Sequence, residues 1–140
     1  RVIAGSLYGR TAPVQTFSDL FYADAVLAPS AKLPLDAVHE ERAAYLLDGT
    51  VRIAGQTFEP GRLLIFRPGD HLVVEAVTPS RLLLIGGEPM DGPRHIWWNF
   101  VSSRKERIEE AKRQWRSQDW GTGLFDLPAT DRTEHIPLPD

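Results

Sequence analysis

The sequence predicts an all-β domain followed by a single helix. Residues 1–88 contain short apolar runs that are separated at regular intervals by Gly and Pro, a pattern typical of a β-sandwich or a barrel. Beyond residue 102 the sequence becomes strongly charged, and its apolar residues recur at helical spacing. The chain has 140 residues, of which 42% are hydrophobic. This is enough for one domain with a core.

The predicted strands follow one another along the first part of the chain. Asp48-Gly49 is a strong hairpin signal, so we expect the strands on either side of it to pair. Ala54-Gly55, Pro60-Gly61 and the Pro68 turn separate the later strands. The strands are expected at 21–27, 43–47, 50–53, 56–58, 62–66, 72–77 and 81–85.

The helix is predicted over about 103–118. Ser103 and Glu106 have the spacing of a capping box, with Ser103 as the N-cap residue. Glu109 and Arg113 are expected to form an i,i+4 ion pair on the exposed side. The apolar face of the helix, which we expect to pack across one face of the barrel, is formed by Ile108, Ala111 and Trp115.

Aromatic residues precede this helix, and an extended tail follows it. Trp97 and Trp98 could line a site for a flat aromatic ligand, or they could anchor one element on another. We favour the anchor. Neighbouring side chains of an extended segment point to opposite sides, so one ring would enter the core and the other would meet a partner. The exposed surface around Trp97, Trp98 and the tail is then expected to be apolar. Residues 121–140 are expected to be extended because prolines interrupt them.

Composition and charge exclude several classes of function. Cysteine is absent, which excludes disulfides, zinc–thiolate sites and a cysteine nucleophile. The net charge is −3, and we expect neither a nucleic acid nor a membrane as a partner. Glutamates interrupt the basic residues of 104–116, which favours a solvated helix over a phosphate-binding surface. With no long apolar run and no recognisable signal peptide, the chain is expected to be cytoplasmic.

Several motifs give the chain a resemblance to a known family. The segment 45–49 resembles the strand and turn of the first cupin motif, and Gly61 and Gly69 have the spacing of the second. More specific is the order of a WWNFVSS run (97–103), a charged helix and a closing IPLP (136–139). This order resembles the C-terminal half of the pirin family. Shorter similarities lie at 2–5, 8–9, 13–14, 39–43 and 86–89.

The resemblance spans essentially the whole chain, and it implies a fold. We expect one pirin-like C-terminal cupin domain over 1–140, with a double-stranded β-helix, or jelly-roll barrel, at about 1–88 and one C-terminal α-helix. Pirins are bicupins, with two such barrels in one chain. The family's metal lies in the N-terminal barrel, where three histidines and a glutamate hold it. Family activities include quercetin 2,3-dioxygenase-type chemistry and metal-dependent transcriptional co-regulation.

The cupin motifs also predict where metal ligands would stand in this chain. Registered on the motif glycines, the four positions hold Asp36, Val38, Arg42 and Leu72. Of these, only Asp36 could bind a metal, and Arg42 adds a permanent positive charge. A metal site needs several ligands at once, so we expect no metal here.

Three further residues are weak metal candidates. His39, Glu41 and His71 each lie one residue out of register, which in a strand places a side chain on the opposite face. The alternative interpretation is that both histidines are turn residues at the rim of the barrel. Arg42 is expected to point inward and to form a buried ion pair with Asp36. It could instead hold a small anionic ligand.

These expectations lead to a functional hypothesis. The chain is interpreted as the metal-free, supporting half of a bicupin, with no catalytic or cofactor-binding residue of its own. Iron or another divalent metal is expected only in the missing N-terminal cupin domain. That domain, or a homodimer partner, is the expected partner, since the chain starts at Arg1 and its one methionine is Met90. A quercetin 2,3-dioxygenase-like oxygenase and a protein-interaction module in transcriptional regulation remain alternatives.

Overall fold

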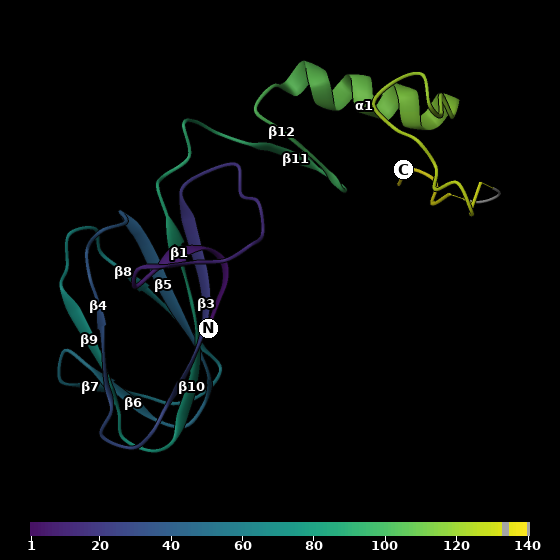
Figure 1. Cartoon of the computed structure of the whole chain (residues 1–140). Helices are drawn as coiled ribbons and strands as arrows, with labels where there is room; N and C mark the ends of the chain where they lie inside the picture. The colour runs from purple at the N-terminus through teal and green to yellow at the C-terminus, as the bar shows by residue number, and fades with distance from the viewer. Residues whose placement is uncertain (133–134, 140) are drawn as a thin grey trace. The chain divides into compact units, whose positions relative to one another are not determined.

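The computed structural model describes residues 1–132 and 135–139, which form two compact units. The first is Arg1–Pro89 and the second is Met90–Asp140. Figure 1 shows strands in the first unit, and a hairpin with the helix in the second. Each unit is described here by itself.

A six-stranded antiparallel sheet forms one side of the first unit. Its strand order is β2-β1-β3-β10-β5-β8. Strands β3, β10 and β5 lie at its centre and pair along nearly their whole length. The bounds are β1 (Val2–Leu7), β2 (Arg10–Thr11), β3 (Leu20–Leu27), β5 (Glu41–Asp48), β8 (Arg62–Phe66) and β10 (Ser80–Gly87).

A four-stranded antiparallel sheet forms the other side, with the order β4-β9-β6-β7. Figure 1 shows it beside the larger sheet. The pairing within the described residues leaves the two sheets as separate layers, as in a jelly roll. The bounds are β4 (Lys32–Leu35), β6 (Val51–Ile53), β7 (Gln56–Phe58) and β9 (Leu72–Ala76).

The core of this unit lies between the two sheets. Inward-facing residues of both sheets contribute, because side chains alternate along a strand. From the larger sheet come Phe21, Leu46 and Leu82, and from the smaller sheet Val51 and Val74, all at most 2% exposed. Every strand predicted between residues 21 and 85 is present, and the predicted all-β class is confirmed, although the described strands form two separate sheets rather than one closed barrel.

The hairpin predicted at Asp48-Gly49 is wrong. β5 pairs with β10 and β8, whereas β6 pairs with β7 and β9, so the chain crosses here from one sheet to the other. Gly49 has φ +79°, and a Cβ atom on it would lie 2.1 Å from the Pro79 carbonyl oxygen. The true two-residue hairpin is Ala54-Gly55, where both φ angles are positive.

The second unit combines a short hairpin with one helix. The hairpin consists of β11 (His95–Trp97) and β12 (Phe100–Ser102), and the helix is α1 (Lys105–Ser117). Ile108 and Ala111 of the helix pack with Phe100, and the partly buried Trp97, Trp98 and Trp115 surround them. The predicted apolar face of the helix is therefore confirmed, and its contacts are with this hairpin. The prediction that it also packs across the barrel stays a prediction.

Two local predictions for the helix are wrong. Its N-cap residue is Arg104, which makes no side-chain capping bond. The hydroxyl of Ser102 accepts a hydrogen bond from the Arg104 backbone at 3.2 Å instead. The exposed ion pairs have i,i+3 spacing rather than the expected i,i+4 spacing: Lys112 pairs with Glu109 at 2.7 Å, and Arg113 pairs with Glu110.

The tail returns to the aromatic cluster without forming a helix in its described part. The indole N–H of Trp115 donates to the Ile136 carbonyl oxygen at 2.8 Å, and Leu138 packs against the same cluster. Thr133, Glu134 and Asp140, which the predicted tail includes, lie outside the described residues.

None of the described helices has the length and apolar character needed to cross a membrane.

Candidate functional site

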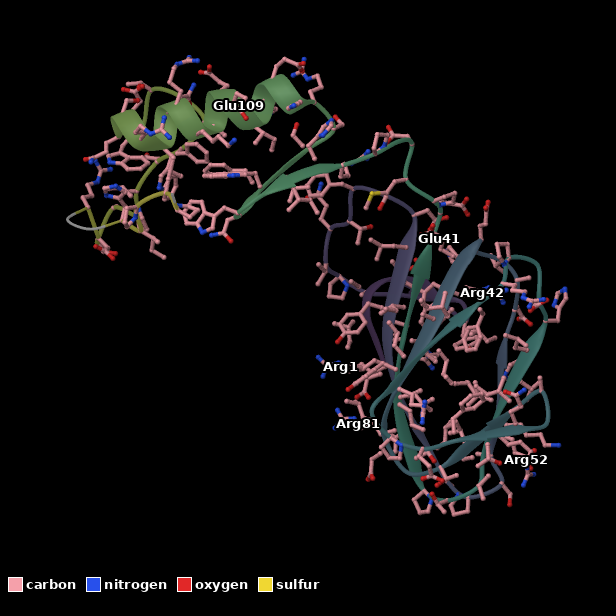
Figure 2. All side chains as sticks on the ribbon, turned by 180° about the vertical axis from the view of Figure 1, so that it is seen from behind. Arg1, Glu41, Arg42, Arg52, Arg81 and Glu109 are labelled. Atoms are coloured by element: carbon pink, nitrogen blue, oxygen red, sulfur yellow. The ribbon has the colours of Figure 1, made fainter. Side chains whose placement is uncertain are left out.

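The candidate site lies at the start of β5, where the first residues of the strand alternate between the two faces of the sheet. Glu41 is exposed, and Arg42 is 2% exposed and points inward. Arg42 lies opposite Phe66 on one neighbouring strand and Gly86 on the other. Figure 2 labels Glu41 and Arg42 toward one end of this unit, and Arg52 toward the opposite end. The site is thus set by the register of three paired strands.

The Arg42 guanidinium binds the backbone of two loops. Its Nη1 donates to the carbonyl oxygens of Leu35 at 3.0 Å, Asp36 at 3.2 Å and Asp70 at 2.7 Å. Its Nη2 donates to the carbonyl oxygen of Arg67 at 2.9 Å. A single side chain of the larger sheet thereby holds the β4–β5 and β8–β9 loops together.

The predicted ion pair between Arg42 and the Asp36 carboxylate is wrong. Arg42 contacts Asp36 through its backbone oxygen, because converging loop carbonyls supply the acceptors that a buried guanidinium needs. Asp36 acts instead on Tyr8: burial, and secondarily this nearby carboxylate, raise the pKa of the Tyr8 hydroxyl. The hydroxyl donates to the Pro34 carbonyl oxygen.

The three weak metal candidates, His39, Glu41 and His71, have different surroundings. His39 is 7% exposed, and its Nε2 lies 3.3 Å from Asp19 Oδ1, with its ring 5.0 Å from that of Phe21. Glu41 and His71 are both exposed, Glu41 at the first residue of β5 and His71 in the loop before β9. His39 lies in the loop between β4 and β5, as expected for a turn residue, but its side chain is buried and has a partner.

The remaining motif positions also differ from a ligand set. Val38 is 77% exposed, whereas Leu72 lies opposite Leu35 and packs against the core. Among the described residues, no group of three or more His, Cys, Asp or Glu side chains could hold a metal ion.

A metal at the cupin ligand positions does not fit this site. The side chain at the motif's glutamate position is a buried guanidinium that donates to four carbonyl oxygens. Its Nε is buried and has no hydrogen-bond partner within the described residues. This N–H could bind a further hydrogen-bond acceptor but not a cation. A divalent cation would meet a permanent positive charge and oxygens that are already engaged.

A cavity of about 400 Å³ adjoins the site. It lies between the turn after β1 and the segment 35–39, and Asp19, Phe21 and His39 are among its lining residues. Its size is in the range of small-molecule pockets. Two carboxylates, Asp19 and Asp36, face it together with Tyr8.

Sequence reasoning missed Asp19 and the carbonyl acceptors of Arg42. Asp19 lies 20 residues before His39, and nothing in its sequence context indicates the contact. Backbone oxygens leave no signature in a sequence. The cupin motif register, which places Arg42 at the glutamate position, was the available signal, and the expected inward orientation of Arg42 is confirmed.

The predicted separation of Trp97 and Trp98 is also wrong. Trp98 has φ +50° in the turn between β11 and β12, so the chain is not extended there. The two rings lie 6.4 Å apart and both join the cluster around Phe100. Lys112 Nζ lies 4.4 Å from the Trp97 ring centre, a cation–π contact. Both tryptophans pack within their own unit.

Comparison with known proteins places the chain in a family context. The family model of the pirin C-terminal cupin domain matches residues 22–121. A pirin-like protein of Caulobacter vibrioides is 43% identical over 140 residues, which is 100% of this chain and 46% of that protein. A protein of Pseudomonas aeruginosa named "Putative quercetin 2,3-dioxygenase" is 33% identical over 99% of this chain and 44% of its own length.

A solved structure shows the same fold. The crystal structure of quercetin 2,3-dioxygenase from Acinetobacter baumannii superposes with a TM-score of 0.79 at 26% identity, over 99% of this chain and 46% of that one. The predicted cupin fold is confirmed. The chain spans less than half the length of each of these three proteins.

Proposed function

The chain belongs to the pirin family as its C-terminal cupin domain, and on this basis we propose that it is a metal-free domain that supports a second, metal-binding cupin domain. It would stabilise and shape that partner, and hold no cofactor itself. Iron or another divalent metal would be bound by the partner domain. The length of the relatives supports this, since each has more than half of its chain beyond the matched region.

One observation carries the proposal: the buried Arg42 guanidinium stands where a cupin would place its carboxylate ligand. Its four bonds to carbonyl oxygens tie together the loops that a metal would otherwise organise. The Arg42 guanidinium thus holds the two loops together, as a bound metal would. It supplies no Lewis acidity and no site for oxygen, so the chain keeps the cupin fold without the chemistry.

Metal loading tests this proposal. The purified chain is incubated with Fe²⁺, Mn²⁺, Ni²⁺ or Cu²⁺, dialysed, and examined by mass spectrometry for bound metal and by an oxygen electrode for consumption with quercetin. We expect far less than one metal per chain and no oxygen consumption above that of the buffer with the same metal. One tightly held metal per chain would overturn the proposal.

A second candidate is a dioxygenase-like activity on an aromatic substrate in this domain. The cavity beside His39 favours it, because Phe21 and Leu35 offer apolar contacts and Asp19 and Asp36 accept hydrogen bonds from hydroxyl groups. The lack of fit for a metal at Arg42 makes it the weaker candidate. Metal-dependent turnover of quercetin by the chain, abolished in His39→Phe but retained in the exposed-site control His71→Phe, would establish it.

A further inference from the structure

The cavity beside His39 has an apolar floor. Phe21 is 2% exposed and Leu35 1%, and both line this cavity of about 400 Å³. Leu7 of β1 and Val38 of the loop before β5 line it as well. Small-molecule sites are typically concave and mostly apolar, with a few polar groups that orient the ligand. The four apolar side chains suit the aromatic or alkyl body of such a molecule.

One ring nitrogen of His39 has no partner at this cavity. His39 is 7% exposed. Its Nε2 lies 3.3 Å from Asp19 Oδ1, and its Nδ1 makes no hydrogen bond within the described residues. Nδ1 is not sealed off, since in that part of the chain only Arg42 Nε is both fully buried and without a partner. A carboxylate only accepts, so Nε2 carries the hydrogen of the neutral ring and Nδ1 is an acceptor.

The other polar side chains of the cavity are acceptors too. Asp19 and Asp36 present carboxylates, which have no hydrogen to donate. The Tyr8 hydroxyl donates to a backbone carbonyl oxygen, and burial, with the Asp36 carboxylate as a second cause, raises its pKa. The Ser6 hydroxyl pairs with that of Thr11 at 2.8 Å. Neither Lys nor Arg occurs among the described residues that line the cavity, so the site favours a ligand that donates hydrogen bonds and carries positive charge.

The acceptors are spread along the cavity rather than gathered at one point. Asp19 stands just before β3 and pairs with His39, whereas Asp36 follows β4 and lies near Tyr8. Within the described residues the Asp36 carboxylate has no hydrogen-bond partner, because Asp36 binds Arg42 through its backbone oxygen. These groups form no cluster that could hold a metal ion, as far as the described chain shows. An extended ligand with two donors matches this spacing better than a single ion.

We propose that the cavity binds a small organic ammonium compound with an aromatic or alkyl body. The ammonium group donates to the Asp36 carboxylate in a charge-assisted hydrogen bond. The body packs on Phe21 and Leu35, and a hydroxyl at its far end donates to His39 Nδ1. This binding needs neither a metal nor a second domain, so the inference goes beyond the proposed supporting role and does not depend on it.

Isothermal titration calorimetry of the chain with tyramine tests the proposal. Tyramine combines an ammonium group, an aromatic body and a phenolic hydroxyl, and we expect it to bind at one site per chain. Tyrosol, with a hydroxyl in place of the ammonium group, and para-hydroxyphenylacetate, which ends in a carboxylate, are the matched ligands. Tyramine should bind about ten-fold more tightly than tyrosol, as expected for one charge-assisted hydrogen bond, and the acid should bind more weakly still.

Variants locate the binding on the molecule. Asp36→Asn should weaken tyramine binding by about five-fold, since it removes the charge of an exposed carboxylate. Asp48→Asn is the matched control. It makes the same change of charge at the far end of β5, it keeps an acceptor for the Gly49 backbone N–H, and it should leave the affinity unchanged. Circular dichroism verifies that the variants fold.

The contact with His39 has its own comparison. Phenethylamine lacks the hydroxyl of tyramine, so the wild-type chain should bind tyramine more tightly than phenethylamine. In His39→Phe this preference should vanish, because Nδ1 is gone while the ring remains. A preference that persists in the variant would contradict the assigned role of His39.

Three results would overturn the proposal as a whole. A wild-type chain that binds no tyramine at millimolar concentration would exclude this class of ligand. Equal affinities for tyramine and tyrosol would show that positive charge is not recognised. Equal effects of Asp36→Asn and Asp48→Asn would place the binding outside this cavity.

Discussion

At the scale of single residues, Arg42 connects the fold to the proposed function. Burying a guanidinium is costly, and hydrogen bonds from its donors to protein acceptors reduce that cost. Here two loops provide the carbonyl oxygens, and Asp36 takes part through its backbone alone. The sequence indicated that Arg42 is buried, but not its partners. Any residue type has a carbonyl oxygen, so only the three-dimensional path of the loops determines which oxygens converge.

Replacing Arg42 should therefore be costly. Arg42→Met keeps most of the side-chain volume but leaves the carbonyl oxygens of the two loops without their donor. We expect a loss of about 2 to 5 kcal/mol in the free energy of unfolding, because buried carbonyl oxygens are left without a donor, measured by urea denaturation. Arg67→Met is the matched control, because only the backbone oxygen of Arg67 takes part and its side chain is exposed. It should change stability by less than about 0.5 kcal/mol. Equal effects of the two substitutions would contradict this account of Arg42.

At the scale of elements, the strands were easier to predict than their pairing. The apolar runs predicted β3, β5 and β8 to within a few residues. Asp48-Gly49 was interpreted as a hairpin because Asp-Gly is typical of two-residue turns. The crossing between the sheets also uses a positive φ at Gly49, so the same dipeptide serves both structures. Strands β1, β2, β4, β11 and β12 were missed. β2 is only two residues long, and β4 contains Pro34, which disfavours a strand except at an edge.

The crossing at Gly49 provides a test of this topology. Gly49→Ala would add the strain of a left-handed backbone and a contact with the Pro79 carbonyl oxygen at 2.1 Å. We expect a loss of about 2 to 5 kcal/mol by thermal or urea unfolding. Gly55→Ala has a similar φ of +81° but no atom within 4 Å of the new Cβ, so it should lose only about 1 to 2 kcal/mol. A smaller loss for Gly49→Ala than for Gly55→Ala would argue against the crossing.

The ion pair between β3 and β10 predicts a dependence on pH. The hydrogen bond from Arg81 lowers the pKa of Asp24 below its ordinary value of 3.8. Because the folded-state pKa is depressed, the stabilisation is present above the ordinary value and is lost as the pH falls through the folded-state value. Asp24→Asn should be less stable than the wild type at neutral pH, and this difference should vanish in strong acid. Urea midpoints measured at both pH values check it.

Arg81→Gln serves as the control for this prediction. In that background Asp24→Asn should produce little pH-dependent difference, because the donor that lowers the pKa of Asp24 is gone. A difference that persists unchanged in acid, or in the Arg81→Gln background, would assign the effect to something other than this pair.

At the scale of the whole molecule, the chain is one cupin domain with an attached hairpin and helix. The family and the cupin fold followed from motif order, since the WWNFVSS run, the helix and the closing IPLP stand in a specific sequence. The contact between Trp97 and Trp98 could not be predicted from the sequence, because it depends on the positive φ of Trp98. The relatives have about twice the length of this chain, so the proposed role is that of one domain in a larger assembly.

The central claim is that a guanidinium, and not a metal, organises the loop end of this cupin domain. A crystal structure of the chain grown with Ni²⁺, with anomalous diffraction recorded at the nickel edge, tests it most directly. We predict electron density for the Arg42 guanidinium bonded to the carbonyl oxygens of Leu35, Asp36, Arg67 and Asp70, and no anomalous peak beside it. A nickel peak at this site, bound by His39, Glu41 or His71 with Arg42 displaced, would contradict the account.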